Sequence, residues 1–108
     1  MSAPLSNSVE WIPRVDVYVS LVGDLNILVE VGPLQREDLN LEVEGEGIRI
    51  RGRRLNPDQA INGRYLVNEL RWGAFERMVA VPPGFDLSMA TANYQSGMLR
   101  ITVPARRG

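Results

Sequence analysis

Apolar residues recur at every second position along most of this chain, and no other feature constrains its fold as strongly. Successive side chains of a β-strand point to opposite faces, so this period of two predicts strands with one apolar and one wetter face. A helical spacing of apolar residues is missing, apart from a short helical turn that residues 35–39 allow. The alternation is clearest in six segments, namely 15–19, 25–31, 39–43, 48–50, 75–81 and 99–103.

Turn-forming residues separate these segments. Gly45-Glu46-Gly47 lies between two short alternating segments and predicts a β-hairpin. Ser96-Gly97 predicts a second tight turn, in which Gly97 can adopt a positive φ. Many short strands joined by such turns are typical of a β-sandwich or barrel. The chain has 108 residues, which fits one domain, and we predict an all-β fold.

One connection is longer than the others. Residues 55–70 contain the turn signals Asn56-Pro57-Asp58 and Asn62-Gly63, and connections of this length in compact domains are often functional. In its centre, Arg64-Tyr65-Leu66-Val67 has the composition of a small extra strand. The segment is either a surface loop or a strand that pairs with a partner chain. We favour the partner chain, because an apolar strand far from its own sheet needs a place to be buried.

The composition excludes several kinds of chemistry. The chain has no cysteine, no histidine and no lysine, so it lacks a thiolate, the usual metal ligand and a Schiff-base or phosphate-loop lysine. Its formal net charge is −1, which provides no field that would attract nucleic acid or an acidic membrane. No signal peptide or apolar segment of transmembrane length is evident. We expect no enzyme, no cofactor, no metal site, and a cytoplasmic location.

Two clusters of charge lie close together in the sequence. Glu42, Glu44 and Glu46 fall at alternate positions, and carboxylates grouped in this way could perform acid–base chemistry or bind calcium. The second cluster is a basic strip made of Arg49, Arg51, Arg53 and Arg54. A nucleic-acid surface would have aromatic residues interleaved for stacking, and the strip has none. Pairing between the two clusters across neighbouring strands explains both of them more simply.

Several motifs resemble the α-crystallin domain of small heat-shock proteins, in the right order and over nearly the whole chain. Trp11-x-Pro13 followed by Asp16 resembles the opening of that domain, and Gly73-x-Phe75-x-Arg77 resembles its central strand. The segment from Ala92 to Pro104 resembles the signature that closes it. Two departures stand out, Gly32-Pro33 in place of proline-glycine and Glu69-Leu70 in place of glutamate-arginine. The signature residues are Gly73, Phe75, Arg77, Ala92, Gly97 and Leu99.

The resemblance implies an immunoglobulin-like β-sandwich of two antiparallel sheets. Residues 1–10 would be a short flexible arm, 11–104 the α-crystallin domain, and 105–108 a truncated tail. The implied function is that of a holdase, a chaperone that binds unfolding client proteins without ATP and limits their aggregation. The implied partners are those clients and a second copy of the chain, with large oligomers in doubt.

The resemblance also implies two surfaces. Clients would bind a groove between a strand at 39–44 and a strand at 89–94. The dimer would form when the extra strand in the long connection is exchanged onto the partner's sheet. The groove residues are Leu39, Leu41, Val43, Met89 and Thr91, and the dimer residues are Arg64, Tyr65, Leu66 and Val67.

Two alternatives stay open at this point. A p23-like co-chaperone sandwich would bind one folded partner and lack the exchanged strand, so the long connection argues against it. A sugar-binding or adhesive sandwich would favour exposed tryptophans, a secretion signal and often calcium. Trp11 and Trp72 are present, but Trp72 adjoins the central motif.

Overall fold

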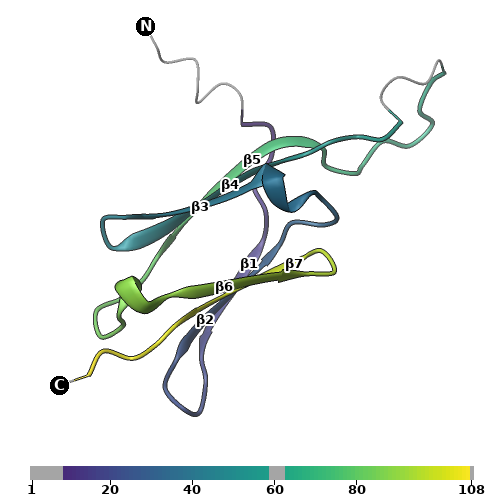
Figure 1. Ribbon diagram of the computed structural model, residues 1–108. Helices are drawn as coiled ribbons and strands as arrows, with labels where there is room; N and C mark the ends of the chain where they lie inside the picture. Colours follow the sequence, from purple (N-terminus) through teal and green to yellow (C-terminus); the bar gives the residue numbers. More distant parts are fainter. Residues whose placement is uncertain (1–8, 59–62, 108) are drawn as a thin grey trace, which may run out of the picture.

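A computed structural model describes residues 9–58 and 63–107 of the chain. Residues 1–8 of the expected arm, residues 59–62 of the long connection and Gly108 of the expected tail lie outside the described residues. Two antiparallel sheets lie one above the other, with strand orders β1-β2-β7-β6 and β3-β4-β5 (Figure 1). The predicted all-β sandwich of two antiparallel sheets is therefore confirmed. The strands are β1 (Val15–Val19), β2 (Leu25–Glu30), β3 (Leu39–Glu44), β4 (Gly47–Arg54), β5 (Gly73–Ala80), β6 (Thr91–Gln95) and β7 (Met98–Val103).

Two short 3₁₀ turns, η2 (Arg36–Asp38) and η3 (Leu87–Met89), precede β3 and β6. The first is the helical turn that the sequence allowed.

The core comes mainly from the inner faces of β2, β4, β5 and β7, because these strands have neighbours on both sides or lie under the other sheet. The alternation predicted for these segments is confirmed, since the large buried apolar side chains of one strand fall at every second position. They include Leu25, Ile27 and Val29 in β2, Ile48 and Ile50 in β4, Phe75 and Val79 in β5, and Leu99, Ile101 and Val103 in β7.

Strand β1 differs from the central strands. Val15 packs against the core, but the next two valines of the same face, Val17 and Val19, are 43% and 55% exposed. Strand β1 is the edge of the four-stranded sheet, and the opposite sheet has only three strands. The apolar residues of β1 alternate as predicted, but the opposite sheet does not cover the face on which Val17 and Val19 lie.

Two glycines are required by their positions. Gly97 has φ of +83° in the tight turn between β6 and β7, as predicted, and its carbonyl accepts hydrogen bonds from the N–H groups of Val31 and Gly32. Gly52 is required for space, because a Cβ atom there would lie 2.4 Å from Cζ of Phe75 and 2.6 Å from the carbonyl oxygen of Asp38. The hairpin predicted at Gly45–Gly47 is also confirmed, joining β3 to β4.

The two charge clusters meet on the outer face of the three-stranded sheet. Arg49 in β4 pairs with Glu44 in β3 and with Glu76 in β5, and Arg51 pairs with Glu42 at 2.8 Å. The predicted cross-strand pairing is therefore confirmed for these residues. The prediction was wrong for three others. Arg53 lies on the outer face but forms no ion pair within the described residues. Glu46 lies in the hairpin turn, and Arg54 turns inward, away from the strip, because the parity of β4 assigns positions 50, 52 and 54 to the inner face.

The Arg49–Glu44 pair gives a prediction for acid stability. The hydrogen bond from Arg49, with its positive charge, holds the pKa of Glu44 below its ordinary value of 4.5. A carboxylate with a lowered folded pKa contributes stability above its unfolded pKa, and loses it as pH falls through the folded pKa. We expect Glu44→Gln to cause a small loss of stability at pH 7 that disappears as the pH falls through the lowered pKa of Glu44. A series of urea denaturation curves from pH 7 into the acid range measures this.

Glu46→Gln, two residues further on in the turn, is the matched control for Glu44→Gln. It removes the same charge next to the same strands without touching an ion pair of the described residues. An equal loss for both variants at pH 7 would show that net charge, and not the Arg49 pair, sets the difference.

Candidate functional site

The two expected groove strands are edge strands of different sheets. Strand β3 is the edge of the three-stranded sheet, and β6 is the edge of the four-stranded sheet (Figure 1). Leu39 and Leu41 of β3 are partly buried and pack against the core, whereas Val43 further along is 57% exposed. The unpaired backbone groups of an edge strand can accept an extended segment of another chain. Strand β3 therefore combines a free edge with an apolar inner face that is only partly covered.

The side of the expected groove opposite β3 begins with η3. The sequence placed Met89 in a strand from 89 to 94, but Met89 ends the 3₁₀ turn and β6 starts at Thr91. Asp86 caps this turn, because its carboxylate accepts hydrogen bonds from the backbone N–H of Ser88 at 3.0 Å and from its hydroxyl at 2.6 Å. These bonds also lower the pKa of Asp86, the hydroxyl contributing most. Met89 is left 61% exposed, with its flexible thioether available to a partner.

The register of β6 separates its two faces. Thr91 lies opposite Thr102 on the outer face of the four-stranded sheet, whereas Ala92 and Tyr94 lie opposite the core residues Ile101 and Leu99. Tyr94 was not among the expected groove residues. Its hydroxyl donates to the carbonyl of Gly32 at 2.8 Å and accepts from the N–H of Leu34 at 3.1 Å. The closing sequence motif contains this tyrosine, but the motif could not predict its hydrogen bonds, because the partners are about 60 residues away in sequence.

The expected dimer residues lie on the long connection, which projects away from both sheets (Figure 1). Residues 64–67 form no strand within the single chain. Tyr65, Leu66 and Val67 are 57%, 86% and 71% exposed, and Leu70 is 68% exposed. Four large apolar side chains therefore lie in solvent on one short segment. Exposed apolar patches of this kind are typical of interaction surfaces.

The family-signature residues have structural roles. Phe75 and Leu99 are core residues, with 2% and 1% exposure. Gly73 accepts a hydrogen bond at its carbonyl from Nε1 of Trp11, and Arg77 donates from Nη1 to the carbonyl of Pro13. These contacts attach residues 10–13 to the free edge of β5. Of the remaining signature residues, Gly97 forms the turn described above and Ala92 lies exposed on β6.

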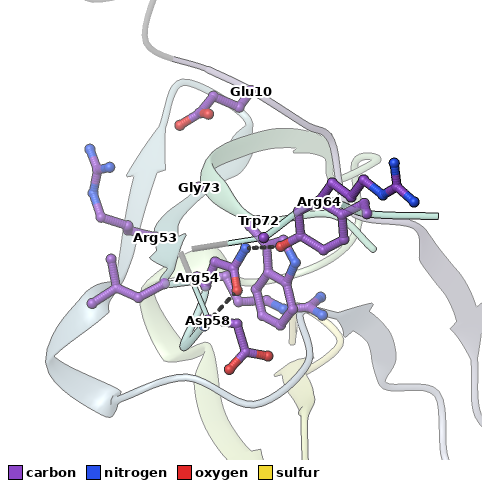
Figure 2. A pocket seen from close by; sticks show the side chains of 11 residues that line it. Glu10, Arg53, Arg54, Asp58, Arg64, Trp72 and Gly73 are labelled. Carbon is purple, nitrogen blue, oxygen red and sulfur yellow. Dashed lines mark hydrogen bonds between the residues drawn. The ribbon is translucent and has the colours of Figure 1, made fainter. Parts of the chain in front are cut away.

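The base of the long connection encloses a concavity of about 650 Å³. Figure 2 shows Trp72 and Arg54 in its centre, with Glu10, Arg53 and Arg64 around the rim. The side chains of Arg53 and Arg64 extend away from the centre, so the arginines do not converge on a single point. Within the described residues, no cluster of three or more potential metal ligands is found. No helix among the described residues is long and apolar enough to cross a bilayer.

A four-stranded and a three-stranded antiparallel sheet, with free apolar edges and a projecting connection, define a β-sandwich of the α-crystallin type. The model of the Hsp20/alpha crystallin family matches residues 22–108, and the chain belongs to this family. Small heat shock protein C2 of Rickettsia felis is 26% identical over 105 residues, covering 95% of this chain and 68% of the relative. Heat shock protein 16 of Schizosaccharomyces pombe is 26% identical over 107 residues, covering 95% of this chain and 74% of the relative.

Solved structures agree with this assignment. The hspA protein of Xanthomonas axonopodis superposes with a TM-score of 0.80 at 26% identity, covering 91% of this chain and 97% of that chain. A small heat-shock protein from Xylella fastidiosa shares the fold, with a TM-score of 0.81 at 24% identity, covering 93% of this chain and 91% of that chain. The resemblance to small heat-shock proteins seen in the sequence is therefore confirmed. The proteins of this family are chaperones, which are not enzymes. The p23-like adaptor and the sugar-binding sandwich are not favoured.

Proposed function

We propose that this chain is an ATP-independent holdase of the cytoplasm, which binds unfolding proteins and limits their aggregation. Family membership supports a chaperone role, and the observation that carries the finer proposal is the exposed apolar surface on the free edges. Val43 on β3 and Met89 on η3 are both more than half exposed. An unfolding chain presents extended apolar segments, which such edges accept through backbone hydrogen bonds and side-chain burial. This association needs no nucleotide.

Light scattering of a heat-labile client protein, heated with and without this chain and without nucleotide, tests the holdase proposal. We expect near-stoichiometric amounts to suppress scattering. Full aggregation of several different clients at a fivefold molar excess of this chain would contradict the proposal.

The client surface that we propose runs between Leu39, Leu41 and Val43 on one side and Met89 on the other. Thr91 would contribute only its backbone at the start of β6, because its side chain lies on the outer face of that sheet. We expect Leu41→Glu combined with Met89→Glu to lower client suppression about tenfold, because carboxylates oppose the burial of apolar segments. Scattering titrations measure the change. Leu41 is partly buried, so Val43→Glu with Met89→Glu is a second variant that changes only exposed residues and leaves the core intact.

The control for this surface is Leu21→Glu with Val22→Glu, which places two charges on exposed positions of the turn between β1 and β2, outside the client and dimer surfaces that we propose. Circular dichroism verifies that each variant is folded. Wild-type suppression by the folded Val43→Glu, Met89→Glu variant would count against the client surface and leave the holdase proposal standing.

We also propose a homodimer in which residues 64–67 of one copy pair with the sheet of the other. The acceptor that the exposed surface favours is β1, which is an edge strand with three consecutive exposed residues, Val17, Tyr18 and Val19. Pairing would satisfy the free backbone groups of both segments and cover the apolar side chains that each leaves in solvent. In the dimer, residues 64–67 of each copy and β1 of the other copy would thereby cover each other.

A further inference from the structure

Arg54 occupies an unusual environment at the base of the long connection. Its Cζ atom lies 4.5 Å from the ring centre of Trp72 and 5.5 Å from that of Trp11. The guanidinium also packs against the backbone of Gly32, where a Cβ atom would lie 2.7 Å from Nη1. Nε of Arg54 is buried and has no hydrogen-bond partner among the described residues. The contacts of this side chain are therefore cation–π contacts with two aromatic rings, not an ion pair within the described chain.

These contacts join three segments that are distant in sequence. Arg54 is the last residue of β4, where the long connection begins, and Trp72 immediately precedes β5, where the connection ends. Their cation–π contact closes the base of the connection. Trp11 belongs to the segment that is attached to β5, through a hydrogen bond from the N–H of Glu10 to the carbonyl of Ala74 at 2.8 Å. The indole of Trp11 adds a hydrogen bond to Gly73 and packs on Phe75 with ring centres 4.9 Å apart.

The neighbouring arginine provides a comparison within the same chain. Arg53 also lines the concavity and carries the same charge, but it lies on the outer face of β4 and is exposed. Figure 2 shows its guanidinium directed away from Trp72, whereas Arg54 lies beneath that ring. Charge alone therefore does not distinguish the two residues. The cation–π contact with tryptophan does, and an arginine guanidinium suits that contact better than a lysine ammonium.

We propose that Arg54 is a positioning residue for the self-association surface. Held between Trp11 and Trp72, it fixes the direction in which the connection leaves the sandwich, and so presents Tyr65, Leu66 and Val67 in an orientation that a second copy can meet. The inference rests on the proposed dimer. A connection that is already oriented loses less conformational freedom on association than one that is free, which strengthens binding without any new contact.

The test compares Arg54→Met, Arg54→Lys and the control Arg53→Met in the full chain. We expect Arg54→Met to raise the dimer dissociation constant about tenfold, equal to about 1.4 kcal/mol, as measured by sedimentation equilibrium. Amide hydrogen exchange should become faster at residues 63–72 and stay unchanged in β2 and β7. Arg54→Lys should lie between wild type and Arg54→Met, and Arg53→Met should match wild type. The tryptophan emission, which reports Trp11 and Trp72 alone, should change only in the Arg54 variants.

Two results would overturn the inference. One is an Arg54→Met variant with the wild-type dissociation constant and wild-type exchange at residues 63–72. The other is faster exchange throughout β2 and β7 as well, which would make Arg54 a general support of the fold. If wild type itself is a monomer at all concentrations, the dimer proposal fails, and exchange at residues 63–72 alone decides the role of Arg54. Faster exchange there in Arg54→Met supports the positioning role, and unchanged exchange contradicts it.

Discussion

Replacing Phe75 with alanine is expected to lower the free energy of unfolding by about 3–5 kcal/mol. Phe75 is 2% exposed and lies on the inner face of β5, near the start of the strand. Its ring packs against Trp11, and the absence of a side chain at Gly52 makes the space that the ring occupies. Removing the ring loses the transfer free energy of its atoms and leaves a cavity that the two flanking sheets cannot close.

A loss of this size is a large part of the roughly 5–15 kcal/mol by which a domain is usually stable. We expect the melting temperature to fall by roughly 15–30 °C, measured by calorimetry or circular dichroism. Phe85→Ala is the matched control, because Phe85 is the only other phenylalanine and is only partly buried at the margin of the core. Equal losses of unfolding free energy for the two variants would contradict the role of Phe75 as a core residue.

Replacing Leu66 with aspartate is expected to raise the dissociation constant of the dimer at least about 100-fold, equal to about 2.7 kcal/mol. Leu66 is 86% exposed in the single chain, so the carboxylate costs the folded monomer little. In the dimer that we propose, the same side chain is covered by the partner, where an unpaired charge is strongly unfavourable. Sedimentation velocity over a range of concentrations measures the change, with thermal melting to verify the fold.

Leu55→Asp is the control for the dimer prediction. Leu55 is 64% exposed and begins the same connection, but it lies outside the segment that we expect to pair. A dimer that is weakened equally by both variants would point to the base of the connection as the contact. A Leu66→Asp variant that remains a dimer at nanomolar concentration would remove residues 64–67 from the interface.

Local sequence pattern was sufficient to predict six of the seven strands and the two tightest turns, whereas β6 was expected only from the family resemblance. The period of two in segments such as 25–31 and 48–50 depends only on backbone geometry, so the buried parity could be assigned without a fold. The hairpin at Gly45–Gly47 and the positive φ of Gly97 are equally local, because the conformation is decided within four residues. The pairing of Arg49 and Arg51 with acidic neighbours followed from the same hairpin, which places the two clusters on adjacent strands.

Tertiary structure alone decided which apolar faces are covered. Val29 and Val19 belong to equally regular patterns, yet one is fully buried and the other is 55% exposed, because β2 lies inside its sheet and β1 lies at the edge. The inward turn of Arg54 and the hydrogen bonds of Tyr94 also could not be predicted, since their partners are contributed by distant segments. Periodicity reports the face on which a side chain lies. What lies against that face depends on how the two sheets are stacked, and no local pattern carries that information.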